Sequence, residues 1–181
     1  MASSPDPTPS LAGGIPSAHE IAPFIEDLDE SKALEHFLGK DLDGAEQLFR
    51  SGSSCYMADL IWMGPTGFRY YVFAAIRYLQ SKEARGDSYA PRGFALALEA
   101  RVRTGMEDLL PIVQQLADAC RYILVHLQEY DLAPGIDDDL HPRYEELVKK
   151  LSRAAAAQRA VSGPDGPKPG GKDVLPGPGG H

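Results

Sequence analysis

The sequence predicts an all-α protein, a compact bundle of six or seven helices with disordered termini. Apolar residues recur at helical spacing through most of residues 18–160, and no segment alternates β-branched and polar residues as a strand would. Both ends are rich in Pro, Gly and Ser, a composition that buries too little apolar surface to offset chain entropy. We therefore expect a disordered N-terminal tail over residues 1–17, a single helical domain over 18–160, and a disordered Pro/Gly-rich tail over 161–181.

The composition and the net charge of the chain fit some classes of function better than others. Of the 181 residues, 43% are hydrophobic and 24% are charged, values that support an ordinary globular core. The net charge of −8 argues against binding to nucleic acid or to an anionic membrane surface, since basic residues cluster only at 149–159. The N-terminus lacks the basic start and apolar run of a signal peptide, and two cysteines make no disulfide framework. We expect a cytoplasmic protein.

Helix start and stop signals divide the first part of the domain. The expected helices span residues 19–28, 31–38, 42–50 and 54–63. Gly39 is placed to end the second of them, and Asp41 is placed to cap the third. The polar run SGSS at 51–54 predicts a turn between the third helix and the fourth.

Prolines mark the second part of the domain. The expected helices span residues 65–81, 92–103, 107–130 and 139–157. Pro65 and Pro142 each suit a first helical turn, and Pro111 lies close enough to the first turn of its helix to be tolerated. A polar loop is expected over residues 82–91.

The segment 65–81 has a high density of aromatic residues. As a helix it carries a complete apolar stripe, formed by Phe68, Tyr71, Val72, Ala75, Ile76 and Leu79. Its other sides hold two further lines, one of Tyr70, Ala74 and Tyr78 and one of Arg69, Phe73 and Arg77. A helix that is apolar nearly all round is usually buried on most sides, so we expect this one at the centre of the bundle.

Arg69 and Arg77 leave two interpretations open. In the first, each arginine forms an internal ion pair that fixes the helix register, because a partly buried guanidinium is costly unless it is paired. The candidate carboxylates are Asp59, Glu83 and Asp87. In the second, the arginines bind an anionic ligand beside aromatic side chains. This candidate ligand-binding site consists of Trp62, Arg69, Tyr70, Arg77 and Tyr78.

No motif predicts catalysis, a metal or a cofactor. The histidines stand at none of the spacings of a zinc site, and the sequence has neither a phosphate-binding glycine loop nor a nucleophile elbow. His36 is expected to face solvent, and His126 to pack at the rim of the core. The aspartates at 137–139 precede the last helix, where carboxylates cap a helix and complement its dipole. We assign no catalytic residue, no metal ligand and no cofactor.

Part of the chain resembles a known group of proteins. The segments FLGKDLDGAEQLFR and CYMADLIWMGPTGFRYYVFAAIRYLQS resemble small bacterial all-helical proteins of unknown function, which share the W-M-G-P break and the F-R-Y-Y helix. The resemblance covers residues 37–81. It implies a bacterial, cytosolic, helical protein in a context similar to that of small toxin-neutralising or accessory proteins.

Taken together, these features favour a non-catalytic protein-binding or accessory module. The acidic net charge suits a basic protein partner, because complementary charge speeds encounter. The alternative is a small enzyme or an anionic-ligand-binding domain that uses Arg69, Arg77 and the surrounding aromatic residues.

Overall fold

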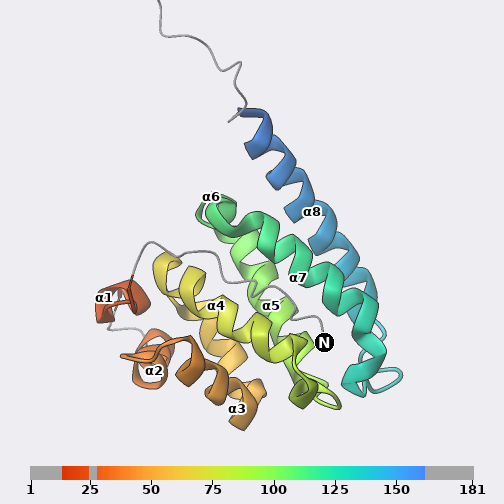
Figure 1. Cartoon of the computed structure of the whole chain (residues 1–181), viewed down its shortest axis with the longest axis horizontal. Coiled ribbons are helices and arrows are strands. Elements are labelled where there is room, and N and C mark those ends of the chain that lie inside the picture. Colours follow the sequence, from red (N-terminus) through yellow and green to blue (C-terminus); the bar gives the residue numbers. More distant parts are fainter. Residues whose placement is uncertain (1–13, 25–27, 162–181) are drawn as a thin grey trace, which may run out of the picture.

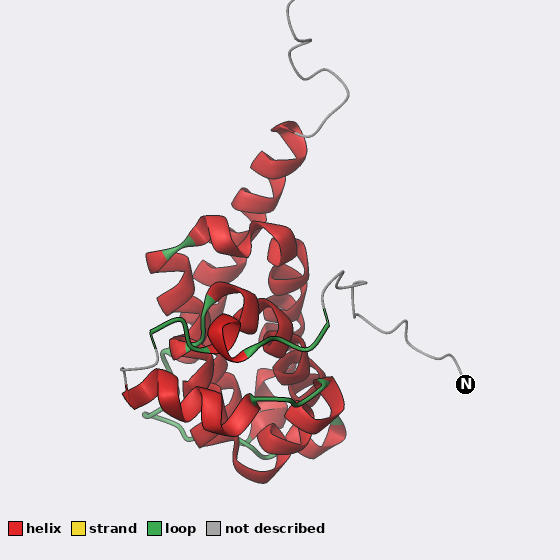
Figure 2. Cartoon of the chain, turned by 90° about the vertical axis from the view of Figure 1, so that its left-hand side faces the viewer, coloured by secondary structure: helices red, strands yellow, loops and turns green. Residues whose placement is uncertain are grey.

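The structure, a computed structural model, describes residues 14–24 and 28–161 of the chain. Within these ranges there are eight α-helices and no strand, which confirms the predicted all-α class (Figure 1 and Figure 2). Six of these helices have ten or more residues, and the other two are single turns. Disorder is predicted for residues 1–17 and 161–181, of which 1–13 and 162–181 lie outside the described residues. Of the others, Ser17 stands at the N-terminus of the first helix and Val161 is the last residue of the last helix.

The helices follow one another with short connections. Their bounds are α1 Ala18–Ile21, α2 Leu28–Phe37, α3 Leu42–Trp62, α4 Pro65–Gln80, α5 Tyr89–Thr104, α6 Met106–Leu109, α7 Val113–His126 and α8 Leu140–Val161. Three 3₁₀ turns connect or extend them: η1 Lys82–Ala84, η2 Leu110–Ile112 and η3 Leu127–Tyr130. None of the helices in the described ranges combines the length and the apolar character that crossing a membrane requires.

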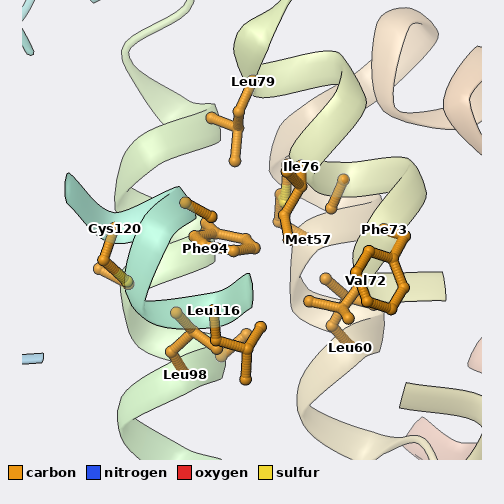
Figure 3. Packing of buried hydrophobic residues seen from close by; sticks show 14 of the residues in the cluster. Met57, Leu60, Val72, Phe73, Ile76, Leu79, Phe94, Leu98, Leu116 and Cys120 are labelled. Carbon is orange, nitrogen blue, oxygen red and sulfur yellow. The ribbon is translucent and has the colours of Figure 1, made fainter. Parts of the chain in front are cut away.

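The aromatic helix α4 is the centre of the core, as the sequence predicts. Ten of its 16 residues are buried, including Phe68, Tyr71 and Tyr78. Figure 3 shows part of the core, in which side chains of α4 meet side chains from three other helices. The labelled residues of those helices are Met57 and Leu60 of α3, Phe94 and Leu98 of α5, and Leu116 and Cys120 of α7, with Cys120 on the side away from α4. The aromatic residues are concentrated in this segment because α4 is covered on most sides.

Several local signals act as predicted. The Asp41 carboxylate accepts a hydrogen bond from the backbone N–H of Gly44 at 2.8 Å and so caps α3. Gly39 follows the end of α2 with a φ of +73°, a left-handed conformation that glycine adopts without steric strain. α4 begins at Pro65, whose missing N–H has no partner to lose in the first helical turn.

The turn predicted at residues 51–54 is wrong. α3 continues through this segment, and within it only Gly52 departs from helical dihedral angles, with φ −173° and ψ 67°. A kink at a glycine beside serines absorbs the bend that the polar run suggested, so the two predicted helices are one kinked helix. The second helix also begins earlier than predicted, at Leu28, and the first ends at Ile21.

Two predicted boundaries near prolines are also wrong. The loop predicted over 82–91 contains η1 and the first turn of α5, where Pro91 is tolerated because the first N–H groups of a helix have no intrahelical acceptor. The single helix predicted over 107–130 is divided into α6, η2, α7 and η3. Pro111 lies inside that run and cannot donate the backbone hydrogen bond that would continue it. The longest helix is therefore α8, with 22 residues.

α8 packs between α5 and α7 and then extends past them. Near its start, Tyr144 donates a hydrogen bond to the backbone oxygen of Pro91 in α5, at 2.7 Å. Arg121 of α7 donates to Ser152 at 2.6 Å, and Arg159, near the end of α8, donates to Gln114 in the first turn of α7 at 2.8 Å, so α7 and α8 run antiparallel. The last turns of α8 project beyond the other helices (Figure 1 and Figure 2).

Candidate functional site

Arg69 and Arg77 lie on the same helix but contact different neighbours. Arg69 donates hydrogen bonds to the backbone oxygen of Asp108 at 3.1 Å and to the hydroxyl of Thr66 at 3.2 Å. Arg77 pairs with the exposed Asp43 at the start of α3, at 3.0 Å. Both arginines therefore connect α4 to other parts of the bundle.

The three carboxylates suggested as partners for these arginines bind other groups. Asp59 pairs with His36 at 2.7 Å, Glu83 lies 3.6 Å from Arg50, and Asp87 accepts a hydrogen bond from the Tyr78 hydroxyl at 2.8 Å. Sequence distance suggested the wrong pairs because helix packing, rather than proximity along the chain, decides which side chains meet.

The aromatic members of the candidate ligand-binding site also contact different neighbours. Trp62, the last residue of α3, is 43% exposed. Tyr70 packs edge-to-face against Tyr71, with 5.0 Å between ring centroids, whereas Tyr78 is buried and bonded to Asp87 near the start of α5. None of the five residues lines either of the two grooves described below.

A half-buried arginine that the sequence did not single out is Arg101 of α5. Its guanidinium carbon lies 4.9 Å from the centroid of the Phe68 ring. The same group donates hydrogen bonds to the backbone oxygen of Leu60, at 3.0 Å, and to that of Met63. Burial lowers the pKa of Arg101 to about 10. Arg101 thus joins α5 to the end of α3, next to the Gly-Pro break.

His36 does not face solvent as predicted. Its Nδ1 atom lies 2.7 Å from an Asp59 carboxylate oxygen, and its ring packs edge-to-face on Tyr56. Asp59 itself is buried. A carboxylate that orients an imidazole is also found in general-base catalysis, but within the described residues no hydroxyl or thiol hydrogen bonds to this ring. The pair therefore connects α2 to α3.

The buried Asp59 should make stability depend on pH. Burial raises its pKa above the usual 3.8, and the hydrogen bond with His36 opposes this shift only in part. Because the folded state holds the proton more tightly than the unfolded state, this stabilising contribution is complete below 3.8 and is lost as pH rises through the raised pKa.

We expect the free energy of unfolding of the wild type, relative to Asp59→Asn, to fall as pH increases from below 3.8 towards neutrality. Urea denaturation of both proteins across this range measures the difference. A difference that is constant, or that grows with pH, would contradict the raised pKa.

A groove of about 730 Å³ lies between α5 and α8. It is lined by Glu99, Val102, Arg103, Asp139, Pro142, Arg143, Glu146, Leu147 and Lys150. The α8 members follow one another at intervals that keep them on one side of the helix. The sequence could indicate that side of α8, but only the packing of α5 beside it makes a groove.

The charges in this groove are ordered along its length. Arg143 donates two hydrogen bonds to the Glu99 carboxylate, at 2.8 and 2.6 Å, and this contact raises the pKa of Arg143. Asp139 lies at the end where α8 begins, 3.5 Å from the same arginine. Arg103 and Lys150 line the groove further along α5 and α8, so it has an acidic end and a basic end.

A second, smaller groove of about 390 Å³ lies further along α8. It is lined by Leu110, Ala154, Ala157, Gln158 and Val161. Leu110 belongs to η2, and the other four residues belong to the last turns of α8. None of the described residues that line this groove is charged, in contrast to the first.

The side chains that line the two grooves are carboxylates, basic groups, aliphatic groups and one amide. The described residues that line them include no histidine, cysteine or hydroxyl side chain. Across the described ranges, no three His, Cys, Asp or Glu side chains are grouped so as to hold a metal ion. These features define an all-helical protein with a partly apolar, charge-ordered groove.

Comparison with protein-family models, with curated proteins and with solved structures finds no match for this chain. The resemblance over residues 37–81 to small bacterial helical proteins therefore stays a prediction.

Proposed function

We propose that this chain is a non-catalytic protein-binding module that holds a segment of a protein partner in the groove between α5 and α8. The observation that carries the proposal is the composition of that groove. Its apolar surface comes from Val102, Pro142 and Leu147, and charged side chains of both signs surround this surface. An apolar centre with a polar rim is the usual anatomy of a protein–protein interface.

The extent of the groove supports a protein segment over a small molecule. Its volume of about 730 Å³ lies in the range of small-molecule sites as well. However, the second groove continues along α8, which favours an extended occupant. Ordered charges along the length would also fix the direction and register in which such an occupant binds.

The cellular role that we propose is an accessory one in the bacterial cytoplasm, of which neutralising a toxin is one form. The support is the resemblance over residues 37–81 together with the absence of a recognised catalytic motif in the sequence. The net charge of −8 favours a partner, or a partner segment, with basic residues.

The proposal is tested by a single substitution in the groove. When the full chain is purified from cells of its natural host, we expect one defined partner protein to co-purify with it. We expect that partner not to co-purify with Val102→Glu. A matched control is Val125→Glu, which introduces the same charge at an exposed site on α7, outside both grooves. Retained proteins are identified by mass spectrometry, and thermal unfolding confirms that both variants are folded. If both variants retain the same proteins as the wild type, the groove is not the binding site.

A further inference from the structure

The two grooves lie along the same side of α8. Six α8 residues that line them are Arg143, Leu147, Lys150, Ala154, Gln158 and Val161. Consecutive members are three or four residues apart, so they form one stripe along the helix, which we call the α8 stripe. With 22 residues, α8 is about 33 Å long, and the stripe runs along most of it.

The end of the α8 stripe is poorly covered by the other residues that the structure describes. Residues 156–161 are all exposed, and Val161 is 81% exposed. Figure 2 shows these turns projecting from the body of the molecule. Helices in proteins gain most of their stability from packing of an apolar face, so a projecting helical end with alanine and valine on one side is suited to packing against another molecule.

The charges beside the α8 stripe are self-complementary. Asp139 and Glu146 lie towards the start of the helix, whereas Lys150 and Arg153 lie further along it. Within the chain, Arg143 pairs with Glu99 and Asp139, and Glu146 lies 3.6 Å from Lys150 and 3.8 Å from Lys149. The pairs of Glu146 are exposed, so they contribute little to stability and leave these charges available to a second copy. Two copies of α8 placed side by side in opposite directions would bring the acidic part of each near the basic part of the other. Their helix dipoles would also be antiparallel, which is the favourable arrangement. In a parallel pair, side chains of like charge would face one another.

We propose that the protein segment held by the groove is α8 of a second copy of this chain. The two copies pair through their α8 stripes in an antiparallel, two-fold symmetric arrangement. With residue 146 of each copy opposite residue 150 of the other, Ala154 and Ala157 of each α8 lie opposite Pro142 and Asp139, at the start of the groove between α5 and α8 of the other copy. A two-fold interface uses the same surface on both subunits and is the commonest arrangement among soluble homo-oligomers. This inference rests on the proposed function, because it names the partner.

The full chain should sediment at twice its mass of 19.6 kDa. Lys150→Glu places like charges across the interface and should weaken dimerisation at least about tenfold, as measured by sedimentation velocity at several concentrations. Lys149→Glu is the matched control. This neighbouring residue undergoes the same change of charge but lies outside both grooves, so the variant should dimerise as the wild type does.

A charge exchange tests the antiparallel direction. Glu146→Lys should also weaken dimerisation, because residues 146 and 150 of each copy would then all be basic. An equimolar mixture of Glu146→Lys and Lys150→Glu should dimerise again, because each reversed charge then faces an opposite charge in the other variant. Circular dichroism confirms that each variant keeps its helical content.

Three results would overturn this inference: a wild-type chain that stays monomeric at the highest concentrations, equal effects of Lys149→Glu and Lys150→Glu, or a mixture that does not dimerise. A monomeric wild type would not overturn the proposed function. The groove would then be free for a different protein, and the comparison of Val102→Glu with Val125→Glu decides that question separately.

Discussion

Replacing Tyr71 with alanine should lower the free energy of unfolding by about 3–5 kcal/mol, the cost of removing a large aromatic side chain from a core. The Tyr71 side chain is fully buried at the centre of α4, and its ring centroid lies 4.8 Å from that of Phe37. Its hydroxyl also donates hydrogen bonds to the backbone oxygens of Phe37, at 2.7 Å, and of Lys40, at 3.0 Å. The alanine variant therefore loses core packing and the connection between α4 and the end of α2.

Two further substitutions separate these effects. Tyr71→Phe keeps the ring and removes only the hydroxyl, so it should cost about 1–2 kcal/mol, the usual range for a buried hydrogen bond whose acceptors remain. Tyr89→Ala removes the same side chain from an exposed position in the first turn of α5 and should change stability by at most about 0.5 kcal/mol. Urea denaturation followed by circular dichroism measures all three. If Tyr71→Ala costs no more than Tyr89→Ala, α4 is not the centre of the core.

The all-α class and the central position of α4 could be predicted because both depend on residues close together in sequence. The apolar period of residues 65–81 continues around most of the helix, and such a helix has to be covered by neighbours. The cap at Asp41 and the start at Pro65 depend on hydrogen bonding within a single turn. Local chemistry decides these features, so the sequence is sufficient for them.

Contacts between distant segments could not be predicted in the same way. His36 and Asp59 are 23 residues apart and meet only because α2 packs on α3. The groove between α5 and α8 needs Val102 and Leu147 on adjacent helices, which no local pattern specifies. Arg101 looks like an ordinary helix-surface arginine in sequence, and its burial depends on how α5 crosses the end of α3. For these features, the arrangement of the helices has to be known first.

Replacing Arg101 with alanine should lower the free energy of unfolding by about 2–4 kcal/mol. The variant loses the contact with the Phe68 ring and leaves two backbone oxygens at the end of α3 without this donor. Burying the charged guanidinium is itself costly, which is why the pKa of Arg101 is lowered. The alanine variant no longer has this cost, so part of the loss is offset. Arg101→Lys should fall between alanine and wild type, because lysine keeps the charge but lacks the planar group that reaches both oxygens.

Arg103→Ala is the matched control, since Arg103 is an exposed residue two positions further along α5 and its loss should cost at most about 0.5 kcal/mol. Arg77→Ala should cost less than Arg101→Ala, because the carboxylate of Asp43, with which Arg77 pairs, is exposed. The same urea denaturation measurements rank the three alanine variants by their loss of stability. Equal effects of Arg101→Ala and Arg103→Ala would mean that the guanidinium does not hold α5 against the end of α3. A larger effect of Arg77→Ala than of Arg101→Ala would mean that Arg77 of α4 contributes more to stability than Arg101 does.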